Sequence, residues 1–286
     1  MQFIGVDLGG TRMRAALVDL QGQVSGFQDQ PTDATRTPAE LVRALARLVE
    51  AVEASCGRRG LPVGVGVPTT VRADGTLAAC PNLPTLPDGY DLARLLEGEL
   101  SRPVRLDNDA RCFTLGELFW GQGRGLHTFA GVTLGTSIGL GLVVGGAAHR
   151  GFRGEAGEIW RSPVGLEALA PTLHDQLSGA AIALAAGTVD GAEAARKARQ
   201  GDTRAQAAWQ AYGQGLGLAL SWVCDVVDPE RVVLGGSVAA SFDLFGDRLR
   251  AVLGGRKTEL VVSKLGDHAA LLGAASLVME NEGGPR

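Results

Sequence analysis

Residues 3–14 read FIGVDLGGTRMR: an apolar stretch, a turn of sequence Asp-Leu-Gly-Gly-Thr, and the start of a second apolar stretch, Ala15–Val18. A glycine turn between two strands exposes successive backbone N–H groups, and such a concave nest binds phosphate. Glycine also lets the backbone approach a ligand closely, with dihedral angles that other residues avoid. Asp7 is placed to hold a cation beside that phosphate, through water. Because a lone turn of this kind is more often an ordinary hairpin, other motifs must decide its meaning.

Two further glycine turns follow along the chain. Leu134–Gly139 reads LGTSIG and lies between two apolar stretches, and Asp228–Ser237 reads DPERVVLGGS. Two hairpin turns that face each other would grip a triphosphate from both sides, with Thr11 and Thr136 as hydroxyl donors. A Gly235-Gly236 step would leave room for a flat adenine or a ribose. The three turns together favour an ATP site.

A candidate catalytic carboxylate follows the predicted strand Val104–Leu106. The strand ends in Asp107-Asn108-Asp109, and a helix is predicted over Ala110–Trp120. The end of a strand, just before a helix, is where ligands bind in α/β proteins, and an Asp there would accept the proton of an attacking hydroxyl. The alternative is a simple helix N-cap, because Asn and Asp are preferred caps. This pattern alone favours the cap.

Length and composition bound the class of protein. The 286 residues predict two domains, and a net charge of −4 without a basic cluster argues against nucleic-acid binding. No apolar stretch is long enough for a membrane span, and the start of the chain lacks a signal segment. The cysteines show no metal-ligand spacing and are predicted to be buried cytosolic thiols: Cys56, Cys80, Cys112 and Cys224. We expect a cytoplasmic protein.

Strands that alternate with helices predict an α/β fold. A helix begins at the N-cap Thr37, with Pro38 at its first position and Glu40 completing a capping box. Further predicted elements are the strand Val63–Val67, a short helix from Asp91, a long helix over Ala205–Val227, the strand Arg231–Leu234 and a final helix over Asp267–Met279.

These motifs, in this order, make the chain similar to the ROK family of sugar kinases, within the sugar kinase, actin and heat-shock ATPase superfamily. The resemblance spans almost the whole chain. It rests on the phosphate turns at Asp7–Thr11 and Gly135–Gly139, the sugar loop Pro81–Pro84, the catalytic Asn108–Ala110, the adenosine motif Asp228–Gly236 and the closing helix around Gly273–Ala275.

The resemblance implies two actin-like (ribonuclease H-like) domains with a cleft between them. A smaller N-terminal domain would span residues 1–109, joined by the C-terminal helix of about 267–286, and a larger domain would span 110–266. Asp109 would be the general base in the phosphorylation of a sugar hydroxyl, often the 6-OH, by ATP in the presence of Mg²⁺. Glucose is the first candidate because glucokinase is the commonest activity of the family.

The resemblance also assigns binding residues. Those for the nucleotide are Asp7 (with Mg²⁺, through water), Gly9, Gly10, Thr11, Arg12, Gly135, Thr136, Ser137, Gly235 and Gly236. Those for the sugar are Asn82, Asn108, Asp109, Glu158, Arg161, His174 and Glu167.

The chain departs from the family pattern after Glu158. The family usually has a histidine where Arg161 stands and then a cysteine-rich zinc loop. The corresponding loop of this chain has no cysteine, so we expect no structural zinc. The next sugar contact is His174 in one register and Glu167 in another, with His174 favoured. Ser137 also stands where a third glycine is common. These changes leave room for fructose, mannose or an N-acetylated hexosamine as the substrate.

A rival interpretation is a sugar-binding sensor without turnover. ROK regulators carry a DNA-binding helix-turn-helix ahead of the first motif, and here that motif begins at Asp7. The resemblance implies a homodimer. The charge and the lack of a long apolar stretch predict that neither nucleic acid nor a membrane is a partner. The glycine turns favour ATP as the phosphoryl donor, and polyphosphate is left open as an alternative donor.

Overall fold

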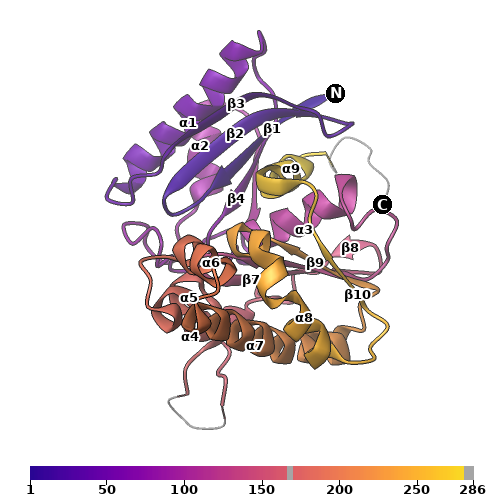
Figure 1. Ribbon diagram of the computed structural model, residues 1–286. Coiled ribbons are helices and arrows are strands. Elements are labelled where there is room, and N and C mark those ends of the chain that lie inside the picture. The colour runs from indigo at the N-terminus through magenta and orange to yellow at the C-terminus, as the bar shows by residue number, and fades with distance from the viewer. Residues whose placement is uncertain (166–169, 280–286) are drawn as a thin grey trace. The chain divides into compact units, whose positions relative to one another are not determined.

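A computed structural model describes residues 1–165 and 170–279 (Figure 1). The chain forms two compact units. Of the described residues, the first unit comprises 1–124, 148–156 and 267–279, and the second comprises 125–147, 157–165 and 170–266. This division differs from the boundary expected after residue 109. The difference arises because helix α3 (Asp109–Trp120) packs closely on helix α9 (Ala269–Ser276) within the first unit.

The first unit is built on a five-stranded sheet of order β3-β2-β1-β4-β5. Strands β1 and β2 form the predicted hairpin and are antiparallel, whereas β1, β4 and β5 run parallel. The elements are β1 (Gln2–Leu8), β2 (Arg12–Asp19), β3 (Val24–Pro31), α1 (Pro38–Ser55), β4 (Val63–Val67), α2 (Leu92–Leu100), β5 (Val104–Asn108), α3, the 3₁₀ turn η3 (Gly266–His268) and α9.

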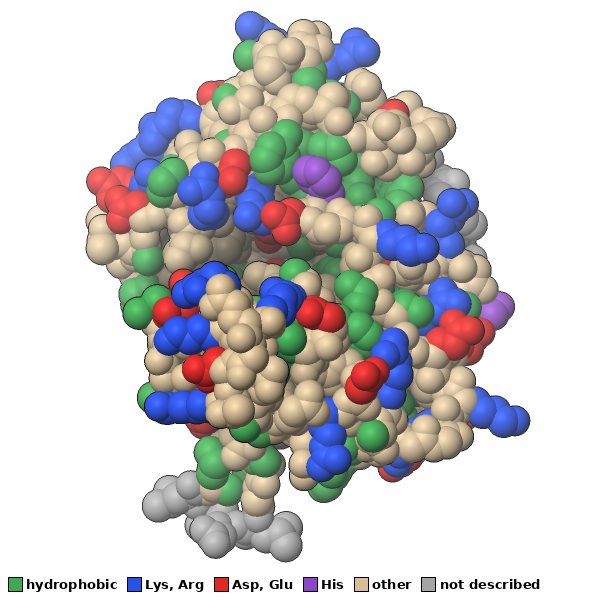
Figure 2. Space-filling view, viewed as in Figure 1, with side chains coloured by type: hydrophobic (Ala, Val, Ile, Leu, Met, Phe, Trp, Pro, Cys, Tyr) green, Lys and Arg blue, Asp and Glu red, His purple; other side chains and the backbone are tan. Residues whose placement is uncertain are grey.

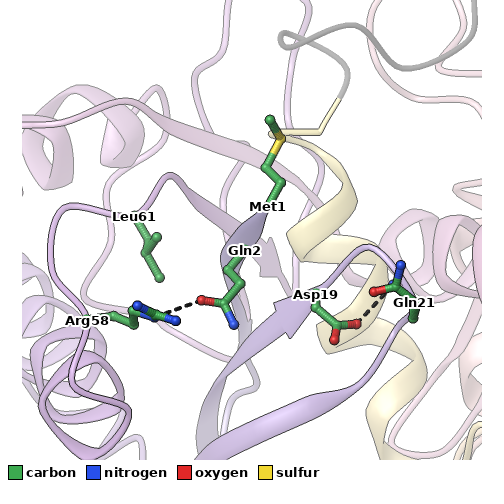
Figure 3. Close-up of a pocket in the computed structure, with 6 residues that line it drawn as sticks. All are labelled: Met1, Gln2, Asp19, Gln21, Arg58 and Leu61. Atoms are coloured by element: carbon green, nitrogen blue, oxygen red, sulfur yellow. Dashed lines mark hydrogen bonds between the residues drawn. The ribbon is translucent and has the colours of Figure 1, made fainter.

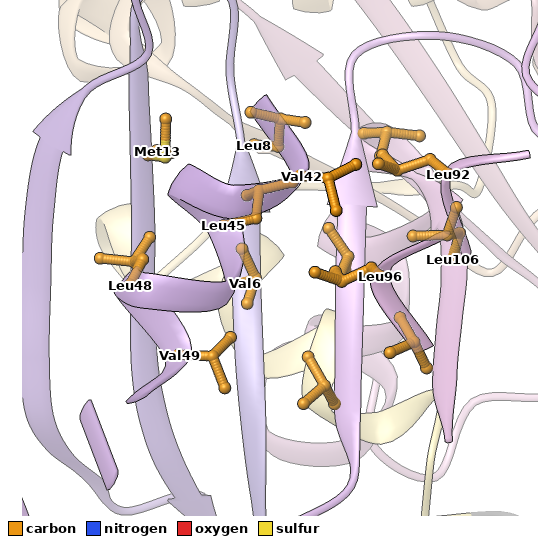
Figure 4. Close-up of a cluster of buried hydrophobic side chains, with 14 of the residues drawn as sticks. Val6, Leu8, Met13, Val42, Leu45, Leu48, Val49, Leu92, Leu96 and Leu106 are labelled. Atoms are coloured by element: carbon orange, nitrogen blue, oxygen red, sulfur yellow. The ribbon is translucent and has the colours of Figure 1, made fainter. Parts of the chain in front are cut away.

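Helices α1 and α2 cover one face of this sheet, and Figure 4 shows the core between these helices and the sheet. Leu45 and Val49 of α1 meet Val6 of β1, whose alternate residues point to this face. The capping box predicted for α1 is confirmed, with the Thr37 side chain accepting from the Glu40 N–H. The sequence therefore encodes both the start and the buried face of this helix.

Helix α9 packs on the other face of the sheet, with α3 beside it. Glycines make this close approach possible. A Cβ at Gly64 of β4 would lie 1.7 Å from the carbonyl oxygen of Ala274, and a Cβ at Gly273 would lie 1.6 Å from that of Cys112. The predicted final helix is shorter than expected: α9 begins at Ala269, after the 3₁₀ turn, and ends at Ser276.

The second unit holds a five-stranded sheet of order β10-β9-β6-β7-β8. Its core includes side chains of helices α7 and α8. Trp209 of α7 and Phe245 of α8 stack there, with ring centroids 5.8 Å apart. None of the described helices is long and apolar enough to cross a bilayer. The elements are β6 (Phe129–Leu134), β7 (Ile138–Val144), β8 (Ala147–Ala148), η1 (Ile159–Arg161), α4 (Leu173–Leu177), α5 (Gly179–Ala186), α6 (Gly191–Arg199), α7 (Thr203–Val227), β9 (Arg231–Gly235), η2 (Ser237–Ser241), α8 (Phe242–Leu253) and β10 (Glu259–Val262).

Candidate functional site

Polar residues of the first unit gather at one edge of its sheet. Asp7 of β1 lies opposite Gly66 of β4, and Gly66 lies opposite Asp107 of β5. Neighbouring strands are about 4.8 Å apart, so the backbones of Asp7 and Asp107 are roughly 10 Å apart. Because the three strands are parallel, their carboxyl ends meet here, which is where ligands bind in α/β sheets.

The first glycine turn connects β1 and β2 at this edge. The Gly9 N–H donates to the Arg12 carbonyl oxygen at 2.8 Å, which closes the turn. Neither Gly9 nor Gly10 has a positive φ, so the expectation of unusual dihedral angles is wrong for this turn. Close packing is the reason for glycine at position 10, because a Cβ there would lie 2.8 Å from Cβ of Asn82. The structure thus brings the predicted sugar loop beside the predicted phosphate turn.

Arg12 and Thr11 have partners within the first unit. The Arg12 side chain donates to Asp29 of β3 at 2.7 Å, and the Thr11 carbonyl oxygen accepts from Thr32. Thr32 is fully buried and its hydroxyl donates to the Gly9 carbonyl oxygen at 2.7 Å. Strand β3 and the residue after it therefore support the turn from outside.

Asn108 is the N-cap of α3, and Asp109 is the first residue of that helix. The Asn108 side-chain oxygen accepts from the N–H groups of Ala110 and Arg111 at 3.0 and 3.2 Å. Its amide nitrogen donates to Oδ1 of Asp109 at 3.1 Å and to the Thr69 carbonyl oxygen at 3.3 Å. The capping interpretation is therefore correct for Asn108, and its amide also orients the carboxylate of Asp109.

A buried ion pair that we did not predict as functional flanks Asp109 in the sequence. Asp107 and Arg111 are almost fully buried and are joined at 2.7 Å, and Arg150 reaches the second oxygen of Asp107 at 3.0 Å. Arg111 also donates to the carbonyl oxygens of Gly154 and Ala156. These contacts tie α3 to the segment that precedes Glu158 in sequence. The spacing of Asp107 and Arg111, four residues apart across a helix start, was the available signal.

Asp7 suits a site for a hard cation. Burial raises the pKa of Asp7 to about 6, with a smaller upward effect from Asp267 and Asp29 and an opposing effect from Arg14. A carboxylate that is short of compensating charge is stabilised by a divalent cation, and Mg²⁺ prefers carboxylate and water ligands. Among the described residues, no three His, Cys, Asp or Glu side chains are grouped to hold a metal ion. Asp7 therefore fits Mg²⁺ held mainly by water and phosphate oxygens.

The second unit brings the other two glycine turns together. The turn between β6 and β7 contains Gly135, whose carbonyl oxygen accepts from the Gly179 N–H at 2.8 Å at the start of α5. Gly236 has a φ of +85°, and a Cβ there would lie 2.4 Å from the carbonyl oxygen of Leu134. Ser237 then lies beside Gly135. The turns predicted for phosphate and for adenosine are thus neighbours, and only at Gly236 is the left-handed region used.

The predicted sugar contacts of this unit lie around η1. Gly157 has a φ of +91° and packs against Leu140 of β7, which places Glu158 at the start of η1. Oε2 of Glu158 accepts from Nε1 of Trp160 at 2.6 Å. Arg161 ends η1 and is exposed. Glu167 lies outside the described residues, and His174 lies on α4, where its ring reaches the turn between β6 and β7.

A separate depression of about 490 Å³ lies at the opposite end of β1 (Figure 3). It is bounded by Gln2, whose side chain accepts a hydrogen bond from Arg58, and by Asp19, whose carboxylate accepts from the Gln21 N–H. Gln2 and Asp7 are five residues apart on one strand, or roughly 16 Å. None of the predicted site residues borders this depression.

Charges are mixed on the surface that Figure 2 shows, where Lys and Arg side chains alternate with Asp and Glu.

Comparisons with known proteins agree with the geometry. Glucokinase of Streptomyces coelicolor is 29% identical over 314 residues, covering 97% of each chain. The N-acetylgalactosamine kinase of Shewanella sp. is 31% identical, covering 83% of this chain and 82% of its own. The structure of a ROK family glucokinase from Streptomyces griseus, in complex with glucose and AMPPNP, superposes with a TM-score of 0.86 at 26% identity, covering 97% of this chain and 99% of that one. Residues 3–281 match the ROK family profile, and the chain therefore belongs to the ROK family.

Proposed function

We propose that this protein is an ATP-dependent sugar kinase that phosphorylates a hexose, with glucose as the first substrate to test and Asp109 as the general base. The observation that carries the proposal is the position of Asp109. It stands at the first turn of α3, at the carboxyl edge of three parallel strands, and the amide of Asn108 holds its carboxylate. Membership of the ROK family and the similarity to glucokinases support the same activity.

Phosphoryl transfer has a loose transition state, so the protein mainly positions the reactants and stabilises charge. Asp109 would accept a hydrogen bond from the attacking sugar hydroxyl and take its proton as the new bond to phosphorus forms. Its Oδ1 already accepts from the N–H of Ala110 and from Asn108.

The nucleotide would be held by the three glycine turns. Gly9, Gly10 and Thr11 would present N–H groups to phosphate oxygens, as would Gly135, Thr136 and Ser137, and Gly235-Gly236 would border the adenosine. Asp7 would hold Mg²⁺ through water, and the ion would supply positive charge that offsets the charge of the phosphates. Arg12 is assigned a weaker part, because Asp29 already neutralises it.

Sugar recognition would use Asn82, Asn108 and Asp109 together with Glu158. A carboxylate accepts from two neighbouring hydroxyls at once, which suits Glu158. Arg161 is exposed at the end of η1 and would act at the rim of the sugar site. Relatives with similar identity differ in their sugars, among them glucokinases, the N-acetylgalactosamine kinase and an N-acetyl-D-glucosamine kinase that is 29% identical. The choice of sugar must therefore be measured.

The experiment is ADP release by the purified protein with Mg²⁺ and ATP, across glucose, mannose, fructose, glucosamine, N-acetylglucosamine and N-acetylmannosamine. We expect release that depends on sugar, with one clear preference. A parallel series with polyphosphate replaces ATP, because a polyphosphate/ATP-glucomannokinase from Arthrobacter shares the fold at a TM-score of 0.75 and 26% identity. Tight sugar binding without turnover for any sugar or donor would favour the sensor interpretation instead.

The Asp109→Asn variant tests the base. It should lower kcat by about 10²- to 10⁴-fold, the usual contribution of general acid–base catalysis, while leaving sugar and nucleotide binding within about threefold. Asp247→Asn is the matched control, because Asp247 is fully exposed on α8. Near-normal turnover of the Asp109→Asn variant would remove Asp109 from the mechanism.

A further inference from the structure

Two unusual residues of this chain contact each other in the second unit. Nδ1 of His174, on the short helix α4, lies 2.9 Å from Oγ of Ser137 in the turn between β6 and β7. This is the turn that we assign to phosphate. The sequence suggested His174 as a sugar contact and gave Ser137 no partner, so this pairing was not expected.

The Ser137 turn is held at its base by backbone hydrogen bonds. The Gly135 N–H donates to the Ser137 carbonyl oxygen at 3.1 Å, and the Gly135 carbonyl oxygen accepts from Gly179. Ser137 stands where a glycine is common in the family, so the turn of this chain carries a hydroxyl that a glycine would lack. The partner of this hydroxyl is His174.

The His174 ring also contacts a residue of the predicted sugar-binding region. Trp160 contacts the ring edge to face, with centroids 6.3 Å apart and planes at 79°. Nε1 of Trp160 donates to Glu158 at 2.6 Å. His174 therefore lies in a line of contacts that runs from Ser137 through Trp160 to Glu158, all within one compact unit.

We propose that His174 is a positioning residue, which sets the phosphate turn through Ser137, and not a ligand of the sugar. The inference rests on the proposed function for its kinetic consequences. A net hydrogen bond is worth enough to change a binding constant by about two- to tenfold. Loss of the His174 ring should therefore weaken nucleotide binding by that factor and leave the KM for sugar within about twofold.

The test is a double-mutant cycle on His174→Ala and Ser137→Ala, with KM for ATP and KM for sugar measured separately. Each single variant should raise the KM for ATP about two- to tenfold. In the Ser137→Ala background, His174→Ala should change it no further, because His174 acts through the hydroxyl. The exposed His149→Ala is the matched control and should behave as the wild type.

Conservative variants distinguish the two nitrogens of the imidazole. In His174→Asn the side-chain amide lies near the position of Nδ1 and should restore much of the ATP affinity. In His174→Gln the amide lies near Nε2 and should not. A rise in the KM for sugar, with the KM for ATP unchanged, would make His174 a sugar ligand and overturn the inference, as would a His174→Ala variant with wild-type constants. Circular dichroism and the melting temperature establish that each variant is folded.

Calorimetric binding of Mg²⁺-AMPPNP without sugar separates this inference from the proposed function. If the wild type turns over no sugar yet binds AMPPNP, the double-mutant cycle can be carried out on the dissociation constant of AMPPNP in place of the KM for ATP. A weaker constant in both single variants, with no further loss in the double variant, would support the role of His174 even though the kinase proposal failed. Equal constants in all four proteins would overturn it.

Discussion

Glu53 of α1 and Arg102, which precedes β5, form a buried ion pair in the first unit. Both oxygens of Glu53 accept from the Arg102 guanidinium, and Leu61 donates its N–H to Glu53 at 2.9 Å. Burial alone would raise the pKa of Glu53, but hydrogen bonds from Arg102 and Leu61 and the charge of Arg102 outweigh burial and lower it. The charged form is thus the stable one in the fold.

Replacement of Glu53 by Gln should destabilise the first unit by about 3–5 kcal/mol at pH 7, because Arg102 would remain buried without its counter-charge. Urea unfolding followed by fluorescence gives the free energy of unfolding. Glu50→Gln, at an exposed position of the same helix, should change it by less than about 0.5 kcal/mol. Equal stability of the two variants would show that the ion pair contributes nothing.

The same pair predicts a dependence on pH. A carboxyl whose pKa is lower in the folded state stabilises the fold above its unfolded pKa of about 4.3. That contribution is lost as the pH falls through the folded value. The difference in free energy of unfolding between wild type and Glu53→Gln should therefore be constant near neutrality and shrink below about pH 4. A difference that stays constant down to pH 3 would contradict this assignment.

At the scale of residues, the positions of polar side chains at the ends of strands could be predicted from the sequence, whereas the contacts between side chains of different loops could not. Asp7 and Asn108-Asp109 follow apolar strands, so their place at the edge of a sheet follows from the pattern. The pairing of His174 with Ser137 joins residues 37 positions apart through a fold that no local pattern specifies. Gly10 was correctly singled out, but the reason is its contact with Asn82 and not its dihedral angles.

At the scale of elements, the contact between α3 and α9 holds the base of the catalytic helix. Gly116 of α3 and Gly273 of α9 let the two backbones touch, since a Cβ at either would lie 2.1 Å or less from a carbonyl oxygen. Helix α3 carries Asp109 at its first position, so a shift of α3 would move the proposed base.

The Gly273→Ala variant should destabilise the protein by about 1–3 kcal/mol and lower kcat more than it raises either KM, because backbone must shift to admit the methyl group. Gly98→Ala on α2 is the matched control. Nothing lies within 4 Å of a Cβ there, and alanine favours a helix, so stability should rise by up to about 1 kcal/mol. Unfolding curves and steady-state kinetics on both variants provide the check. A Gly273→Ala variant as stable and active as wild type would show that α3 and α9 can move apart to admit the methyl group at no cost.

Elements with strong caps or a clear period were predicted well. Helix α1 begins at its predicted cap, and the hairpin of β6 and β7 has the predicted turn. Strand β3 was missed because its residues alternate between half-buried and exposed, so no apolar stretch marks it. The packing of α3 with α9 was also missed, because the glycines that allow it are 157 residues apart and signal nothing locally.

At the scale of the whole molecule, we predict that the chain holds no structural zinc, because the loop that follows Glu158 has no cysteine where the family has its zinc ligands. The described cysteines are all free thiols. In the segment around Glu158, the rings of Trp160 and His174 are in contact, Trp160 donates a hydrogen bond to Glu158, and His174 is hydrogen-bonded to Ser137.

Metal analysis by mass spectrometry should accordingly find less than about one tenth of a zinc ion per chain after dialysis. Excess EDTA should leave the melting temperature unchanged, because a structural zinc contributes to folding and its loss would unfold the region it holds. Turnover is no readout here, since EDTA also removes the Mg²⁺ of the nucleotide. The Trp160→Ala variant supplies the complementary test: if this ring orders the segment in place of a metal, the variant should melt several degrees lower in either buffer. One zinc per chain, with a melting temperature that EDTA lowers, would contradict both expectations.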